Sequence, residues 1–202
     1  MAEWISGISL LEVVAVGFSV LYLVLAIRQI IWCWVAAFIG SVLSIFVFFD
    51  AQLFMQSALQ VFYAAMAIYG WLQWSRRIEG VRLPITTWSW RRHLAAVAGV
   101  SAVSIVFAYG LSFTAQAMPW LDSFVTVAAL LTTWMVAHKV FENWIYWFVI
   151  DSLSIYLYYT QELSLYAALF VVYIVLVVIG FRQWLGDLRA QSGASGMLRE
   201  PA

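Results

Sequence analysis

The residues best suited to chemistry in this sequence surround one acidic residue inside an apolar segment. Asp151 lies near the middle of that segment, where a charge costs about 2.5–3.5 kcal/mol at the centre of a membrane. Spacings of three and four place Trp144, Trp147, Ser154 and Tyr158 on the same helical stripe. Indole faces attract cations and stack on flat rings, and the carboxylate supplies a counter-charge. The stripe therefore predicts a site for a flat, positively charged aromatic ligand.

A second set of polar residues occupies an earlier apolar segment. Gln56, Gln60 and Tyr63 follow one another at helical spacing. A primary amide inside a membrane needs a hydrogen-bond partner, so we expect Gln60 and Tyr63 to face the same central cavity as Asp151. The polar residue Asn143, at the start of the Asp151 segment, completes the set of candidate binding residues.

Each of these residues also has a purely structural reading. Trp144 and Trp147 can belong to the aromatic belt at a membrane boundary. Asp151 can pair with Ser41, Ser44 or a tyrosine, and Gln residues in membranes often bond only to a neighbouring helix. Composition and spacing leave these alternatives open.

Catalysis, metal binding and nucleic-acid binding find little support. Cys33 is the single cysteine, and the two histidines, His93 and His138, lie at separate segment ends where we expect them to be solvated. No HExxH motif or nucleophile–base pair occurs, and no Gly-rich segment resembles a channel filter. The net charge is zero, so composition does not indicate nucleic-acid binding. We expect no catalytic residue, metal or cofactor; a membrane-embedded enzyme or a channel is the less favoured alternative.

Composition places the chain in a membrane. Of its 202 residues, 65% are hydrophobic and 10% are charged, whereas a soluble domain carries about 25% charged residues. A crossing helix needs about 20 mostly apolar residues. Suitable segments are residues 10–27, 32–49, 53–74, 93–113, 121–137, 144–160 and 163–184. We therefore expect an all-α integral membrane protein with seven transmembrane helices.

The basic residues predict the orientation. If all seven segments cross, one side collects every Lys and Arg of the chain, and the other side has only acidic residues. The basic set is Arg28, Arg76, Arg77, Arg82, Arg91, Arg92, Lys139, Arg182, Arg189 and Arg199; the acidic set is Glu3, Asp50 and Glu162. Because basic loops stay in the cytoplasm, we expect the N-terminus outside and the C-terminus inside.

The sequence also contains an internal repeat at an offset of 110 residues. The matching pairs include Trp34/Trp144, Ser44/Ser154, Leu53/Leu163, Tyr63/Tyr173, Gly70/Gly180, Gln73/Gln183, Trp74/Trp184 and Glu12/Asp122. Equivalent segments are four apart, so the two units run in parallel around one connecting helix, a 3+1+3 plan. Parallel repeats of this kind occur in secondary transporters.

The repeat predicts the organisation of the chain and an asymmetric site. Residues 1–78 form the first three-helix repeat, 79–118 the loop and connecting helix, 119–186 the second repeat, and 187–202 a disordered cytoplasmic tail. Asp151 corresponds to Ser41, and Gln60 corresponds to Phe170. An asymmetric ligand bound between equivalent units would require such differences.

Two local motifs connect the chain with a known family. The third segment ends in Tyr69-Gly70-Trp71-Leu72-Gln73-Trp74, and the sixth begins Asn143-Trp144-Ile145-Tyr146-Trp147 before Asp151. With these motifs the chain resembles the PnuC family of bacterial vitamin transporters, over about residues 10–185. The resemblance implies a SWEET-like fold in the bacterial inner membrane, with Trp144 and Trp147 as ring-stacking residues and Gln60 as a hydrogen-bonding residue.

The same resemblance implies a function. It indicates facilitated uptake of a vitamin, with phosphorylation by a cytoplasmic kinase trapping the substrate, and it implies a homotrimer. Nicotinamide riboside is the favoured substrate because it is the commonest in the family. Thiamine also carries a cationic ring and is the main alternative, whereas riboflavin is neutral and larger and suits Asp151 less well.

Overall fold

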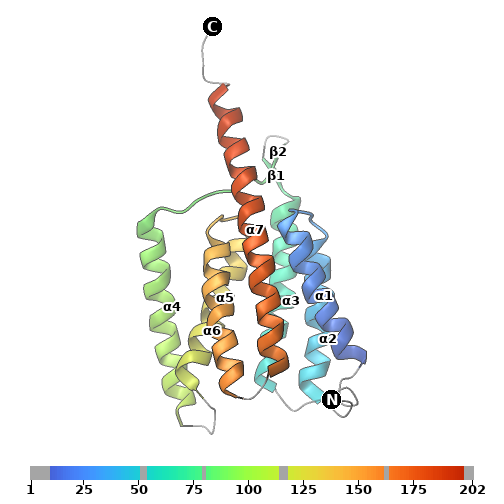
Figure 1. Ribbon diagram of the computed structural model, residues 1–202, viewed down its shortest axis with the longest axis vertical. Coiled ribbons are helices and arrows are strands. Elements are labelled where there is room, and N and C mark those ends of the chain that lie inside the picture. Colours follow the sequence, from blue (N-terminus) through green and yellow to red (C-terminus); the bar gives the residue numbers. More distant parts are fainter. Residues whose placement is uncertain (1–9, 51–53, 79–80, 114–117, 162–163, 198–202) are drawn as a thin grey trace. The chain divides into compact units, whose positions relative to one another are not determined.

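The structure is a computed structural model that describes residues 10–50, 54–78, 81–113, 118–161 and 164–197. These residues form seven helices and one short β hairpin. The chain divides into two compact units, Met1–Leu83 and Pro84–Ala202, called unit 1 and unit 2 below (Figure 1). All long elements are helical, as expected for a chain that must satisfy its backbone within each segment in lipid.

Unit 1 contains three helices and the hairpin. Its helices are α1 (Leu10–Ile27), α2 (Cys33–Asp50) and α3 (Phe54–Ser75), and its strands are β1 (Arg77–Ile78) and β2 (Val81–Arg82). Helix α2 packs against both α1 and α3, and the two strands pair antiparallel. Small residues allow the close approach of α1 and α2, since a Cβ at Gly40 would lie 3.2 Å from Cβ of Phe18.

Unit 2 contains four helices. They are α4 (Trp90–Leu111), α5 (Pro119–Ala137), α6 (Asn143–Thr160) and α7 (Ser164–Met197), and each packs against the next in the chain. Helix α4 turns Val100, Ser104 and Ala108 inward. The Ser104 hydroxyl donates to the backbone oxygen of Ser123 in α5, at 3.4 Å. The connecting helix is thus part of unit 2.

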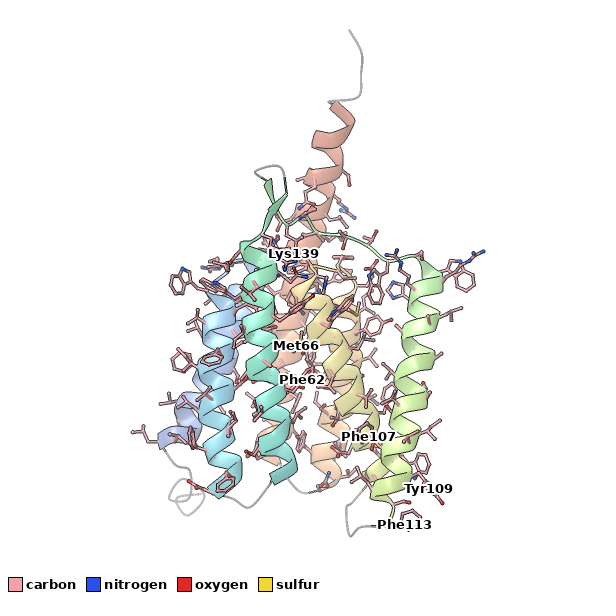
Figure 2. The ribbon with its side chains drawn as sticks, turned by 180° about the vertical axis from the view of Figure 1, so that it is seen from behind. Phe62, Met66, Phe107, Tyr109, Phe113 and Lys139 are labelled. Carbon is pink, nitrogen blue, oxygen red and sulfur yellow. The ribbon has the colours of Figure 1, made fainter. Side chains whose placement is uncertain are left out.

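The outer surface of α4 is strongly apolar. Phe107, Tyr109 and Phe113 are 55%, 64% and 75% exposed, and Figure 2 shows them along one end of α4. Further apolar side chains of the same helix are 45–71% exposed, namely Leu94, Val97, Val103, Ile105 and Val106. Isolated exposed apolar residues are common on soluble proteins, but so many around one helix are not. This surface indicates that lipid, and not water, surrounds α4.

The helices begin and end within a few residues of the predicted bounds, with one exception. Helix α7 continues to Met197 and extends beyond α5 and α6 (Figure 1), so the predicted disorder is wrong for residues 187–197. This extension contacts the segment before α4, because Gln191 Oε1 accepts a hydrogen bond from Ile85 N at 3.2 Å. The predicted boundaries at residues 78 and 118 also differ from the single division after Leu83.

By length and composition alone, fewer helices qualify as membrane spans than we expected. Among the described residues, Trp90–Leu111, Pro119–Ala137 and Tyr166–Gly193 are long and apolar enough, and Val13–Ile27 and Cys33–Val47 are apolar but shorter. Helices α3 and α6 carry the Gln, Asn and Asp residues that lower their apolar character. These are the helices that hold the candidate binding residues.

Candidate functional site

Helix α6 begins at a tight turn that buries its first residues. Lys139 in this turn has a φ of 51°, a left-handed conformation uncommon outside glycine. Asn143, the first residue of α6, is fully buried and its Nδ2 donates to the backbone oxygen of Val140 at 2.7 Å. The side-chain amide of this candidate residue therefore closes the turn.

Trp144, near the start of α6, packs against α7. It is 2% exposed, and its ring lies so close to Gly180 that a Cβ there would overlap three ring atoms. Its centroid lies 5.4 Å from that of Trp184, at 81° between the ring planes. This burial excludes a place in an interfacial belt and favours a packing role, while the predicted stacking on a substrate stays a prediction.

The matching residues of unit 1 have the same arrangement. Trp34 is 2% exposed and lies against Gly70, with the ring of Trp74 at 5.5 Å and 89°. The turn before α2 contains Gln29 at φ 53°, the counterpart of Lys139. Ile30 N bonds to Leu25 O at 3.0 Å, as Val140 N bonds to Met135 O at 3.0 Å. Residues 110 apart thus share backbone and side-chain geometry.

Asp151 and Ser154 are buried on the same face of α6. They are 3% and 1% exposed. The Ser154 hydroxyl donates to Ile150 O at 2.9 Å and so satisfies itself within the helix. No described residue gives the Asp151 carboxylate a hydrogen bond or an ion pair. The sequence-based alternative, in which Asp151 pairs with a serine or tyrosine, therefore finds no such contact among the described residues.

Trp147 faces a different neighbour from Trp144. It is partly buried against a cluster formed by Val100, Ala128, Ala129 and Ile150, from α4, α5 and α6. A separation of three residues sets the two side chains only about 60° apart around α6, yet their rings meet different neighbouring helices. Trp144 thus packs against α7. Trp147 stays partly accessible, one helical turn before Asp151.

Tyr158 continues the polar stripe toward the end of α6. Its ring stacks on Tyr166 at 5.5 Å and 24°, and on Phe170 at 5.4 Å and 16°. Phe170 is the counterpart of Gln60, so aromatic packing occupies in unit 2 the position of an amide in unit 1. The predicted asymmetric ligand site stays a prediction.

The remaining candidates belong to unit 1. Gln60 and Tyr63 are half-buried on α3, and Tyr63 contacts the ring of Phe62 at 6.0 Å; Phe62 is labelled on α3 in Figure 2. The side chain of Gln56 lies outside the described residues. The structure thus divides the candidate residues between the units, with the amide-bearing set in unit 1 and the carboxylate with its indoles in unit 2.

Sequence reasoning missed a polar cluster at the start of α4 and α6. His93 Nδ1 lies 3.0 Å from the Tyr146 hydroxyl, and His93 Nε2 lies 3.9 Å from Glu142 Oε1. The ring of Trp88 is 5.6 Å from that of His93. We expected His93 to be solvated, but the structure gives its ring these three neighbours. The spacing of Glu142 and Tyr146, one helical turn apart, was the available signal.

Metal chemistry finds no candidate in the described part of the chain. No group of three His, Cys, Asp or Glu side chains is placed to hold a metal ion there. What the arrangement offers instead is a buried carboxylate, a partly accessible indole and nearby hydroxyl groups inside apolar helices. Such groups can bind a small cationic ring without covalent chemistry.

These features describe an all-helical membrane protein with a polar, aromatic interior, the class that includes small-solute transporters. Residues 9–186 match the family described as nicotinamide mononucleotide transporters, and the chain belongs to this family. The predicted resemblance to PnuC proteins is thereby confirmed.

The names of individual relatives give different vitamins as their substrates. The riboflavin/roseoflavin transporter RibM of Streptomyces davaonensis is 26% identical over 167 residues, covering 80% of this chain and 78% of its own. The nicotinamide riboside transporter PnuC of Escherichia coli is 27% identical over 171 residues, covering 71% of each chain. A crystal structure of the vitamin B3 transporter PnuC superposes with a TM-score of 0.72 at 20% identity, covering 89% of this chain and 82% of its own. That structure shows the same fold.

Proposed function

We propose that the protein carries nicotinamide riboside, a small vitamin with a positively charged pyridinium ring, across the bacterial inner membrane. The observation that carries this proposal is the buried Asp151 carboxylate, to which no described residue gives an ion pair. Ionisable residues inside membrane helices usually mark a pathway or a site. A cationic ligand would supply the missing charge.

The other candidate residues have complementary roles in this proposal. Trp147 stacks on the pyridinium ring, and Gln60, Tyr63 and Ser154 bond to the hydroxyl groups of the ribose. Gln56 is proposed for the same role on sequence alone. Trp144 and Asn143 support the site chiefly by fixing the start of α6, since both are buried in the packing described above.

Riboflavin is the second candidate substrate. The relative named as a riboflavin/roseoflavin transporter matches this chain about as well as the one named for nicotinamide riboside. Riboflavin has a neutral ring system, however, and would leave Asp151 without a counter-charge. Thiamine, whose thiazolium ring is cationic, satisfies Asp151 as nicotinamide riboside does and is the third compound to compare.

We further infer that the chain is a duplicated, SWEET-like 3+1+3 assembly whose seven helices all cross the membrane. Support comes from the shared turns at Gln29 and Lys139 and the shared Trp–Gly contacts at positions 110 apart. The distribution of basic residues supports an outside N-terminus and a cytoplasmic C-terminus.

The proposed mode of transport rests on the resemblance to the PnuC family. We propose facilitated diffusion, in which a cytoplasmic kinase phosphorylates the vitamin and prevents its return, by a homotrimeric protein. Purified protein in liposomes would test this: labelled nicotinamide riboside should equilibrate across empty vesicles and accumulate only in vesicles loaded with its kinase and ATP. Accumulation in empty vesicles along an ion gradient would contradict facilitated diffusion.

Binding tests the substrate directly. We expect nicotinamide riboside and thiamine, but not riboflavin, to lose affinity about tenfold or more in Asp151→Asn, the effect of removing one charged partner from a buried pair. Asp50→Asn removes an exposed acid at the end of α2 and serves as the control. Tight binding of riboflavin alone by the unmodified protein would instead support the second candidate.

A further inference from the structure

A short segment before α4 lies along the turn between α5 and α6. Thr86 N donates to Lys139 O at 3.0 Å, and Phe141 N donates to Thr86 O at 2.8 Å, which makes a parallel bridge between Thr86 and Val140. Lys139 is labelled at this turn in Figure 2. We call residues 85–88 the strap, because their backbone follows the turn in this way.

Side chains extend the contact at both ends of the strap. Trp88 N lies 3.2 Å from each carboxylate oxygen of Glu142 and donates to them. Ile85 N donates to Gln191 Oε1 in the extension of α7. The ring of Trp88 also lies 6.0 Å from that of Trp134 in α5. The strap thus joins α5, α6 and α7 within unit 2.

The turn beneath the strap is almost completely covered. Lys139, Val140 and Phe141 are 5%, 2% and 8% exposed. A buried lysine in a loop is unusual for a side chain that normally keeps its ammonium group in water. The α5–α6 turn therefore differs from the α1–α2 turn of unit 1 in how completely it is covered, and not in its backbone conformation.

The counterpart turn of unit 1 has the same backbone but is less completely covered. Gln29 has the same left-handed φ as Lys139 and is half-buried. Ile30 is 37% exposed, against 2% for its counterpart Val140. One sequence repeat therefore produces two turns of the same backbone, of which that of unit 1 is the less covered.

We propose that the strap holds the α5–α6 turn fixed, with Thr86 and Glu142 as positioning residues for the start of α6, and that the less covered α1–α2 turn is the one that opens during transport. Opening of a segment needs less free energy where fewer buried contacts and hydrogen bonds must break. The second half of this proposal rests on the transport function proposed above.

Fixing the turn matters because α6 carries the proposed counter-charge. Asn143 and Trp144 follow the turn directly, and Trp144 lies against Gly180. A change at the turn would shift α6 along or around its axis and move Asp151 with it. The strap therefore gives the asymmetric site one stationary wall.

Hydrogen exchange on the full-length protein tests the first half without any substrate. The amides of Val140 and Phe141 should exchange about fivefold or more slowly than those of Ile30 and Ile31, as expected from at least one additional hydrogen bond that must break. Equal or reversed rates would overturn the proposal. The shared backbone bonds make the two turns an internal control for each other.

Variants of the strap locate the effect. Thr86→Pro removes the N–H donor to Lys139, and Glu142→Ala removes the acceptor for Trp88. Each should raise exchange at Val140 about fivefold and leave Ile30 unchanged. Thr87→Ala, at an exposed neighbouring position, should change neither. If a strap variant fails to fold, the comparison of the two turns in the unmodified protein still decides.

Thiol labelling tests the second half. Cys33 borders the α1–α2 turn and Val140 lies in the α5–α6 turn, and they are 0% and 2% exposed. With nicotinamide riboside present, a maleimide should modify Cys33 severalfold faster than in its absence, whereas Cys33→Ser/Val140→Cys should show no such increase. An increase at position 140 alone would overturn the assignment of the mobile turn. If nicotinamide riboside binds but changes neither rate while the exchange contrast persists, the assignment of the mobile turn fails and the strap does not; absence of vitamin binding and uptake would instead contradict the transport function.

Discussion

The ring of Trp144 lies directly on the backbone of Gly180, and that of Trp34 lies in the same way on Gly70. Each tryptophan also meets a second one, Trp184 or Trp74, edge to face. In both units a glycine on the last helix, α3 or α7, provides the space for the first tryptophan of the preceding helix, α2 or α6. This pair of contacts explains why the repeat retains Trp and Gly at matched positions.

The first prediction concerns these glycines. Gly180→Ala and Gly70→Ala should each destabilise the protein by about 1–3 kcal/mol, the usual range for overpacking, because the added Cβ overlaps ring atoms. The midpoint of thermal unfolding in detergent measures this. Gly99→Ala and Gly186→Ala are matched controls, since an added Cβ there meets no atom within 4 Å. These controls should be neutral or slightly stabilising, because alanine favours a helix by about 1 kcal/mol over glycine.

The second prediction separates packing from binding at two tryptophans of α6. Trp144→Phe should lower the unfolding midpoint, because it leaves space next to Gly180, and should affect binding through that loss of order. Trp147→Phe should weaken the binding of nicotinamide riboside several-fold, since stacking on the larger indole contributes about 0.5–2 kcal/mol, and should lower the unfolding midpoint less than Trp144→Phe, because Trp147 is only partly buried. Equal effects of both variants on both measurements would contradict the division of roles.

The helices and the repeat were predictable because they depend on local patterns. Apolar runs of sufficient length predict helices regardless of their neighbours, and Trp34, Gly70 and their counterparts stand out against an apolar background. The burial of Asp151 followed from the same reasoning, since a carboxylate is too costly to face lipid.

Three features depended on tertiary contacts that spacing does not encode. The strap bonds Trp88 to Glu142, which are 54 residues apart. The extension of α7 contains Gly and Ser, which favour a disordered reading, but Gln191 bonds to Ile85 and ties it to unit 2. Finally, spacing placed Trp144 and Trp147 on one stripe, whereas the arrangement of α4, α5 and α7 around α6 decides which helix each one meets.

The third prediction concerns orientation. A C-terminal fusion to a fluorescent protein that folds only in the cytoplasm should be bright, and a fusion to alkaline phosphatase, which is active only outside, should be inactive. The reason is that, if seven segments cross, every basic residue of the chain lies on the same side of the membrane as the C-terminus, and basic loops stay in the cytoplasm. Fusions after Asp50, at the opposite end of α2, provide the control and should give the reverse pair of signals. The same signals at both positions would contradict the seven-span arrangement.

The final prediction exchanges the polar residues by which the two units differ. Ser41 is 8% exposed on α2, and its counterpart Asp151 is 3% exposed on α6. Asp151→Ser gives unit 2 the residue of unit 1 and should weaken binding of cationic vitamins about tenfold or more, because it removes the charged partner while keeping a small polar group. Ser41→Asp in the same chain restores the net charge but places the carboxylate in the other unit. If the position of the charge matters, this double variant should not recover the affinity for nicotinamide riboside in a fluorescence titration. Full recovery would mean that Asp151 acts only through net charge, and unchanged affinity in Asp151→Ser alone would remove the carboxylate from the site.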